Sequence, residues 1–321
     1  MKNVISLINE KGYAETMQNE IEPYLAKIRT EGYFSSFDGN NIHYEFHKTE
    51  NAKGTVVLVH GFTEFAEKFR EMDYYFIKNG FNTFALDNRG HGHSYRLKGS
   101  TETVRLNKFS DYIEDLDTFV NKVVKPNSGN LPLYVFSHSM GGGIVARYIQ
   151  VHNNVFEKAI LSSPMICAQT GAPVPFAKVV MNFATSVGLH NVSVPGMCKF
   201  NPNATYENSS DTCKERFEYF LNKRRKNPMY RTSGPTFGWV DEALKLTDQL
   251  LDDNNCSNVN SEVLIFQPEW DNRVISSYQN TFADKLPNAK LIYIAGSKHE
   301  IFATTNDVLE GYLDKIMDFL S

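Results

Sequence analysis

The chain has 321 residues, of which 41% are hydrophobic and 22% are charged, so it is long and apolar enough to bury a substantial core. Its net charge of -4 gives no reason to expect a nucleic-acid partner. No run of 18 apolar residues is present and the first residues do not form a secretory signal, so we expect a cytoplasmic protein. Cys167, Cys198, Cys213 and Cys256 lack metal-binding spacing and are expected to be reduced thiols.

Strands and helices are predicted to alternate along most of the chain. Residues 2–30 are expected to be helical, and residues 33–46 alternate around Asp38-Gly-Asn-Asn41, which is typical of a hairpin. Buried strands are then predicted at residues 55–60, 81–86, 133–136, 159–161, 263–266 and 291–294. Helices are predicted at residues 67–79, 109–124, 143–151, 276–285 and 307–320. This order indicates an α/β fold with a mostly parallel sheet flanked by helices.

The alternation stops between residues 167 and 258 and then resumes. We therefore expect an α/β core formed by residues 1–166 and 259–321, with residues 1–30 as an N-terminal helical extension. Residues 167–258 are expected to form an inserted, mainly helical cap that folds over one edge of the sheet.

The strongest chemical signal is a serine in a glycine-rich turn, in the segment Phe136-Ser-His-Ser-Met-Gly-Gly-Gly143. The segment lies between a predicted strand and a predicted helix, which is the setting of a nucleophile elbow. Because the backbone of such a turn is strained, the residues two positions before and two positions after the serine must be small. In this chain they are Ser137 and Gly141. The usual pattern is G-x-S-x-G, so the chain departs from it at Ser137. We expect Ser139 to be a nucleophile; a turn without a catalytic role is the alternative.

A serine nucleophile needs a base that is oriented by an acid, and in this type of sheet the chain order is serine, acid, histidine. Of the nine histidines only His299 follows residue 258, and it comes directly after a predicted strand. Ligands gather at that edge of such sheets, so His299 is the expected base. The acid is expected after the preceding strand, where Asp271 and Glu269 are the candidates.

The oxyanion of a tetrahedral intermediate needs two preorganised hydrogen-bond donors. One is expected to be the backbone N–H of Met140, the residue after the nucleophile. The other is expected to be the N–H of Phe62, because Gly61 permits a close approach after the strand at residues 55–60. The side chains of Met140 and Phe62 would line an apolar acyl pocket. This chemistry needs neither a metal nor an organic cofactor.

The segment Asp87-Asn-Arg-Gly-His-Gly-His-Ser94 looks reactive because it concentrates histidine, arginine and aspartate. We interpret it as structural, since its two glycines permit a tight loop. Arg89 is expected to donate hydrogen bonds to carbonyl groups beside the serine turn.

Three motifs of this chain resemble those of a family of α/β-hydrolases. The motifs are His60-Gly-Phe62, the segment 87–94 and Ser137-His-Ser-Met-Gly-Gly142. The family includes monoacylglycerol lipases, lysophospholipases and serine aminopeptidases of the S33 type. The similarity covers most of residues 30–320 and is greatest to the bacterial lysophospholipases. It implies an eight-stranded, mostly parallel sheet and cleavage of lysophospholipid or monoacylglycerol acyl esters through an acyl-enzyme. It favours Asp271 as the acid, because that family has an apolar residue three positions later, here Val274.

The expected cap contains an apolar stripe at helical spacing, made by Phe176, Val180, Phe183 and Val187. One interpretation is that this stripe packs the cap on the body. The other is that Phe176, Val180 and Phe183 face the substrate pocket or a membrane surface and admit an acyl chain, with Trp239 in the same wall. The partners expected are thus a lipid or small acyl ester and, transiently, a membrane surface.

Two other functions remain open at this stage. A serine aminopeptidase or proline iminopeptidase would use similar chemistry and would need acidic residues in the cap, for which Asp211, Glu215 and Glu218 are available. A non-catalytic ligand-binding protein on a hydrolase fold is the other alternative, and the complete set of serine, acid and histidine argues against it.

Overall fold

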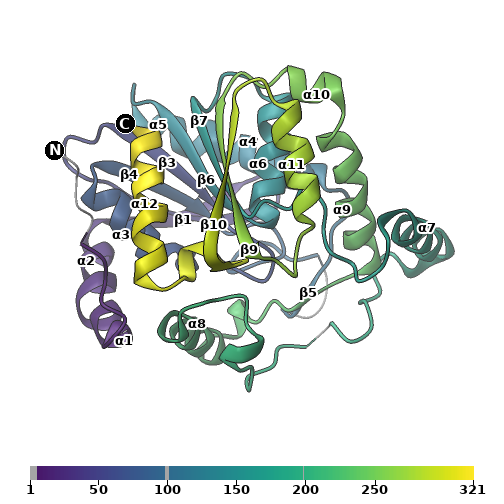
Figure 1. Cartoon of the computed structure of the whole chain (residues 1–321), viewed down its shortest axis with the longest axis horizontal. Coiled ribbons are helices and arrows are strands. Elements are labelled where there is room, and N and C mark those ends of the chain that lie inside the picture. Colours follow the sequence, from purple (N-terminus) through teal and green to yellow (C-terminus); the bar gives the residue numbers. More distant parts are fainter. Residues whose placement is uncertain (1–5, 98–100, 198) are drawn as a thin grey trace.

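The computed structural model describes residues 6–97, 101–197 and 199–321 of the chain. Its main sheet has eight strands in the order β1-β2-β4-β3-β6-β7-β9-β10 (Figure 1). The strands are β1 (Arg29–Ser35), β2 (Asn41–His47), β3 (Gly54–Val59), β4 (Phe81–Leu86), β6 (Leu133–His138), β7 (Lys158–Ser162), β9 (Glu262–Trp270) and β10 (Ala289–Lys298). The β1–β2 and β2–β4 pairs are antiparallel and the other five pairs of neighbours are parallel. The predicted α/β fold with an eight-stranded, mostly parallel sheet is confirmed.

Helices cover both faces of this sheet (Figure 1). One face carries α4 (Ser110–Phe119), η3 (Val120–Val124), α5 (Lys125–Ser128), α6 (Met140–Val151), α9 (Phe237–Leu250), α10 (Asp253–Ser257) and α11 (Ser276–Lys285). The other face carries α1 (Tyr13–Thr16), η1 (Met17–Ile21), α2 (Glu22–Ile28), η2 (Ala66–Phe69), α3 (Arg70–Lys78), η7 (Ile301–Ala303) and α12 (Asn306–Leu320). Side chains of a strand alternate between the faces, so Val57 and Val59 join the first core while Val56 and Leu58 join the second.

The N-terminal segment is less helical than its composition predicts. Helical structure begins at Tyr13, whereas residues 6–12 are not helical and residues 2–5 lie outside the described part of the chain. The reason is local: the Asn9 side chain accepts a hydrogen bond from the Lys11 N–H at 3.0 Å, and Gly12 has a φ of 81°. The hairpin prediction is confirmed, with Gly39 at a φ of 83° in the turn between β1 and β2.

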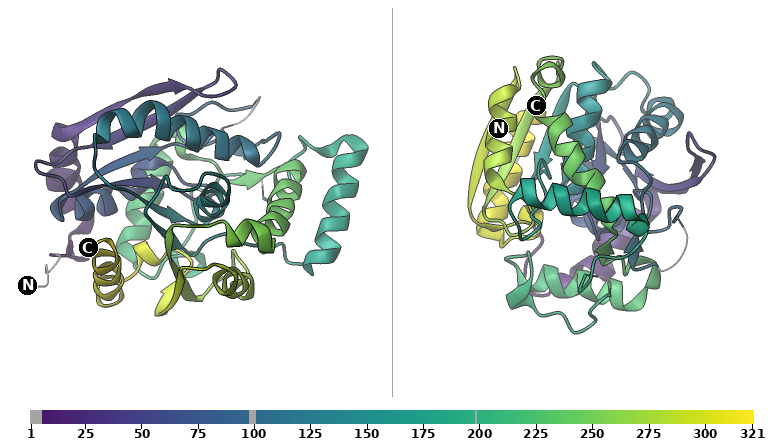
Figure 2. Two further views of the ribbon diagram at one scale, coloured as in Figure 1. Left: turned by 90° about the horizontal axis from the view of Figure 1, so that it is seen from above. Right: turned by 90° about the vertical axis from the view of Figure 1, so that its right-hand side faces the viewer.

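Residues 167–258 divide between the body and its periphery. α9 is part of the body because Trp239, Leu246 and Leu250 are buried in the first core. α7 (Val174–Ala184) and the following η4 (Thr185–Leu189) lie outside α9 and project from one end of the molecule (Figure 2). η5 (Tyr206–Asn208), α8 (Lys214–Lys226) and η6 (Pro228–Tyr230) follow, and α8 lies below the lower edge of the sheet in Figure 1. The division into core and cap at residues 166 and 259 stays a prediction.

Short pairings tie this region to the body. β8 (Gly234–Pro235) is parallel to β5 (Thr103–Val104), which lies in the long connection after β4. Cys167, Cys213 and Cys256 are buried and unpaired, while Cys198 is outside the described residues. Within the described ranges, no helix combines the length and the apolar character needed to cross a bilayer.

Candidate active site

Ser139 stands at the turn between the end of β6 and the first residue of α6, as the sequence predicts. Its φ of 53° and ψ of -117° are unfavourable for a residue with a side chain. Gly141 is required here, because a Cβ at this position would come within 2.1 Å of the Val59 carbonyl oxygen. Ser137 fits where the usual pattern has glycine, since its buried hydroxyl donates a hydrogen bond to the Ile160 carbonyl at 3.2 Å. The strained turn thus places Ser139 at the carboxyl edge of the sheet.

The structure brings the three predicted catalytic residues into one chain of hydrogen bonds. The Ser139 Oγ lies 2.8 Å from the His299 Nε2, and the His299 Nδ1 lies 2.8 Å from the Asp271 Oδ2. The other carboxylate oxygen of Asp271 accepts the backbone N–H groups of residues 273 and 274 at 2.8 and 3.0 Å. Glu269, the competing acid, instead accepts the Gly296 N–H at 2.7 Å. Asp271, and not Glu269, therefore contacts His299 in this structure.

Burial and hydrogen bonds shift the pKa values of His299 and Asp271. His299 is 5% exposed, and burial lowers the pKa of its imidazole although the Asp271 carboxylate acts in the opposite direction. Burial alone would raise the pKa of Asp271, but the hydrogen bond from His299 and two backbone N–H groups hold it below its ordinary value. A neutral His299 then donates from Nδ1 to the carboxylate and offers a lone pair at Nε2 to the Ser139 hydroxyl. This is the state that a general base requires.

The two backbone donors expected for an oxyanion lie beside the nucleophile. A Cβ at Gly61 would come within 3.0 Å of the Ser139 Cβ, so the loop after β3 touches the serine turn. Met140 is the first residue of α6, where backbone N–H groups have no partner within the helix. Among the described residues, neither the Met140 nor the Phe62 N–H has a hydrogen-bond acceptor.

Comparison with known proteins then identifies the family. Residues 50–306 match the family Hydrolase_4, described as serine aminopeptidase, S33. The chain belongs to this family. It is a serine hydrolase.

Individual relatives match over most of their length. The chain is 25% identical over 301 residues to lysophospholipase L2 of Escherichia coli (strain K12), covering 91% of this chain and 88% of that protein. It is 27% identical over 309 residues to monoglyceride lipase of Saccharomyces cerevisiae, covering 89% and 92%. The structure of a soluble variant of that yeast enzyme, in complex with a substrate analog, superposes with a TM-score of 0.71 at 21% identity and covers 91% and 96%. The last comparison shows the shared fold.

The residues predicted to bind substrate in this hydrolase occupy two different environments. Trp239 is 5% exposed; its ring centroid lies 4.4 Å from that of Phe62, and its Nε1 donates to the Tyr112 hydroxyl at 3.3 Å. Phe176, Val180 and Phe183 are 62%, 37% and 66% exposed on α7. The interpretation that they pack the cap on the body is wrong, because α7 packs through its smaller residues, Val174, Ala177 and Ala184.

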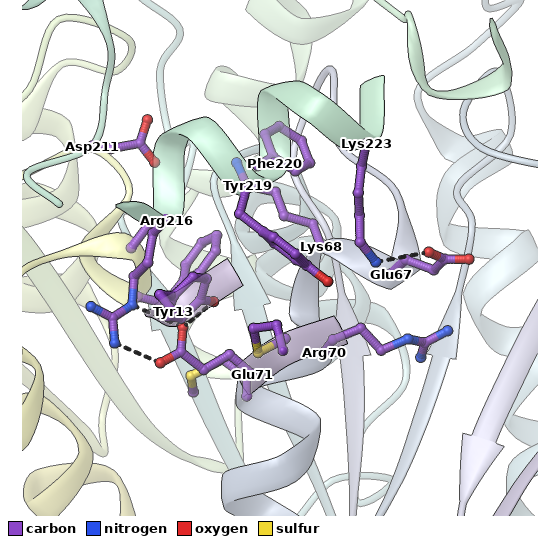
Figure 3. Close-up of a pocket in the computed structure, with 14 residues that line it drawn as sticks. Tyr13, Glu67, Lys68, Arg70, Glu71, Asp211, Arg216, Tyr219, Phe220 and Lys223 are labelled. Atoms are coloured by element: carbon purple, nitrogen blue, oxygen red, sulfur yellow. Dashed lines mark hydrogen bonds and ion pairs between the residues drawn. The ribbon is translucent and has the colours of Figure 1, made fainter. Parts of the chain in front are cut away.

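A separate hollow lies between α1, α3 and α8 (Figure 3). Arg216 from α8 donates to both carboxylate oxygens of Glu71 at 2.8 and 2.6 Å, and Lys223 pairs with Glu67 at 3.1 Å. None of Ser139, Asp271 and His299 lines this hollow. These two ion pairs join α8 to η2 and α3, and the Tyr13 hydroxyl of α1 also donates to Glu71 at 2.7 Å, which is typical of a contact that holds α8 and the N-terminal helices to the body.

One group of the described residues has the spacing of metal ligands: atoms of Glu10, Cys213 and Glu215 lie within 4.8 Å of one another. The Arg216 guanidinium is 3.4 Å from the Cys213 sulfur and already supplies a positive charge there. The donor set therefore does not fit a cation, and it is not connected to Ser139.

A buried ionic cluster lies behind His299 and was not predicted from the sequence. It contains Glu64, Lys68, His138 and Glu300, and Glu64 accepts the Gly61 N–H at 2.6 Å and the Lys68 ammonium at 2.9 Å. Lys68 also donates to Glu300, the residue after His299. The one signal available in the sequence is the spacing of four between Glu64 and Lys68, which also occurs on ordinary solvated helices.

Proposed function

We propose that this serine hydrolase cleaves the acyl esters of lysophospholipids or monoacylglycerols, with Ser139 as nucleophile, His299 as general base and Asp271 as orienting acid. The continuous hydrogen-bond chain of these three side chains, each link 2.8 Å long, is the observation that carries the proposal.

In the proposed reaction, the His299 Nε2 takes the proton of the Ser139 hydroxyl as its oxygen attacks the ester carbonyl carbon. The N–H groups of Phe62 and Met140 stabilise the negative oxygen of the tetrahedral intermediate. His299 then gives the proton to the departing alcohol, and an acyl-enzyme remains on Ser139. Water, deprotonated by His299, attacks the carbonyl carbon of this ester. The bond to the Ser139 oxygen then breaks, His299 returns the proton to that oxygen, and the fatty acid is released. The scheme requires neither a metal nor an organic cofactor.

The substrate class rests on two supports. Relatives that match most of this chain carry the names lysophospholipase L2 and monoglyceride lipase. The apolar rings of Phe62 and Trp239 pack together beside the serine turn, and each methylene of an acyl chain buried against such a wall contributes about 0.8 kcal/mol. A long acyl chain would therefore dominate recognition.

The outer face of α7 supports transient contact with a membrane surface as part of this function. Large apolar side chains are exposed along it and along the chain that follows: Phe176, Val179, Val180, Phe183, Val187, Leu189 and Val192. α7 projects away from the sheet (Figure 2), so this face can reach a lipid surface without rearrangement of the body.

The aminopeptidase alternative receives less support from the geometry. Glu215 and Glu218 are exposed on α8, and Glu218 pairs with Lys214 at 3.8 Å. Asp211 is buried, and burial together with the neighbouring Glu300 carboxylate raises its pKa well above the ordinary value. A carboxyl group whose pKa is raised in this way is a poor anionic site for a substrate amine.

A substrate panel tests the proposed function. We expect kcat/KM to be larger for a long-chain lysophospholipid and a monoacylglycerol than for a short p-nitrophenyl ester, and Pro-p-nitroanilide to be inert. Turnover of Pro-p-nitroanilide without turnover of the esters would contradict the proposal and favour the aminopeptidase.

A further inference from the structure

His138, the residue before the nucleophile, is held by two groups that can only accept hydrogen bonds. Its side chain is 1% exposed. Its Nδ1 lies 3.0 and 3.2 Å from the two carboxylate oxygens of Glu64, and its Nε2 lies 3.2 Å from the His299 carbonyl oxygen. A neutral imidazole has one N–H and satisfies one such acceptor, whereas an imidazolium has two. The geometry therefore requires a doubly protonated His138.

The surroundings balance that charge. Glu64 and Glu300 are anionic partners of Lys68, which donates to both. Asp211 lies beside Glu300, and burial together with the Glu300 charge raises its pKa well above the ordinary value. The Glu64 carboxylate contacts two cationic groups, the Lys68 ammonium and the His138 imidazole. The Arg224 guanidinium acts on Glu64 and Glu300 from α8. A neutral His138 would remove one of the two cations that contact the buried Glu64 carboxylate.

Burial alone would lower the pKa of His138, but the Glu64 carboxylate raises it above the ordinary value, in agreement with the hydrogen-bond geometry. The same cluster keeps the pKa of Glu64 well below its ordinary range, because the charges of His138 and Lys68 outweigh the effect of burial.

His138 also connects the loop after β3, which contains Gly61 and Phe62, with the backbone of His299. Through Glu64 it is linked to the N–H of Gly61, next to the expected oxyanion donor Phe62. Through its Nε2 it holds the backbone carbonyl of His299, which the Ser163 hydroxyl also binds at 2.7 Å. The ring centroids of His138 and His299 are 4.9 Å apart, so a positive His138 disfavours protonation of His299.

We propose that His138 is a positioning residue that remains an imidazolium during the reaction, fixes the backbone of His299 against the oxyanion loop and favours a neutral His299 imidazole in the resting enzyme, before it takes the proton of Ser139. This inference rests on the proposed role of His299 as the base. It assigns to Glu64 the role of stabilising the imidazolium.

The pH dependence of kcat/KM on a soluble p-nitrophenyl ester tests this role. His138→Asn removes the positive charge, so the acid limb, which reports protonation of His299, should move to higher pH by about one unit. We also expect a lower kcat at a nearly unchanged KM. His152→Asn is the matched control, because His152 lies at the end of α6 and its side chain is partly exposed. An acid limb of His138→Asn that coincides with that of the unaltered enzyme would overturn the proposal.

Glu64→Gln gives an independent variant. Glutamine can still accept the Gly61 N–H, but it removes the anion that stabilises the imidazolium. The pH at which activity falls on the alkaline side should therefore decrease relative to the unaltered enzyme. An unchanged alkaline limb would contradict the role given to Glu64.

The protonation state is measured without any substrate by ¹⁵N NMR of the imidazole nitrogens in the unaltered enzyme, with His138→Asn identifying the signals. We expect both His138 nitrogens to carry protons from about pH 6 to 8. A neutral His138 at pH 7 would overturn the inference. If the enzyme hydrolyses no ester, the proposed function fails, while this spectrum still decides the state of His138.

Discussion

The carboxyl edge of the sheet and the outer face of α7 differ in which side chains they bury: the first buries polar groups and the second exposes apolar ones. At the sheet edge, Ser139 and His299 are polar, nearly inaccessible and matched with partners at hydrogen-bond distance. On α7, Phe176 and Phe183 are apolar and mostly exposed. The first arrangement supports the proposed reaction, whereas the second has no partner within the described chain and supports the proposed contact with a lipid surface. Substitutions at the edge should therefore affect every ester, and those on α7 should affect lipid-bound substrates alone.

Loss of the nucleophile should have the largest effect and should not discriminate between substrates. We expect Ser139→Ala to lower kcat by about 10⁶-fold on both a soluble ester and a monoacylglycerol in phospholipid vesicles. Ser277→Ala, on the exposed side of α11, is the matched control and should retain activity. Substantial activity of Ser139→Ala on either substrate would show that another group performs the attack.

Loss of the acid should have the next largest effect. Asp271→Asn places an amide N–H opposite the His299 Nδ1 and favours the wrong tautomer, so kcat should fall by about 10⁴-fold on both substrates. Glu269→Gln is the control because Glu269 binds the backbone of Gly296 instead. Equal losses in the two variants, measured by steady-state kinetics, would contradict the assignment of Asp271.

Changes on α7 should separate the two kinds of substrate. The double substitution Phe176→Ser and Phe183→Ser removes two exposed rings, so activity on vesicle-bound monoacylglycerol should fall by about tenfold or more. Activity on soluble p-nitrophenyl butyrate should stay the same. Tyr293→Ser removes a ring that is 54% exposed on β10 and should leave both activities unchanged. Equal losses of the double variant on both substrates would place these residues in the pocket or in the stability of the fold.

The pH profile should show the smallest effect. The reaction needs a neutral His299, and burial lowers its pKa below the ordinary value of 6.5. The acid limb of the profile should therefore be centred below pH 6.5, and activity should decline as the pH falls through the lowered pKa of His299. The measurement is kcat/KM on a soluble ester between about pH 4.5 and 8. An acid limb centred above pH 7 would mean that the Asp271 carboxylate raises the pKa of His299 by more than burial lowers it.

Local sequence rules predicted the features that depend on neighbours along the chain. The strained turn at Ser139 needs small residues nearby, and the alternation of strands and helices places His299 and the acid loop at the same edge of the sheet. The choice between Asp271 and Glu269 followed from a resemblance, and the structure supplies the physical reason in their different hydrogen bonds.

Contacts between distant residues were not predictable in this way. Arg89 was expected to bind carbonyl groups, but it donates to the carboxylates of Asp115 and Asp38, at 2.6 and 3.0 Å. Lys68 and Glu300 are 232 positions apart, and their pairing follows from the packing of η2 against the loop after β10. The exposed side of α7 was also undetermined, because an apolar stripe does not reveal whether protein or lipid covers it.

The central claim is that Ser139 is the activated nucleophile, and covalent labelling tests it most directly. The folded enzyme is treated with a fluorophosphonate, and the modified residue is identified by peptide mass spectrometry. We expect one labelled site, at Ser139, with labelling lost in Ser139→Ala and strongly slowed in Asp271→Asn. Labelling at another residue, or undiminished labelling of Ser139→Ala, would contradict the account.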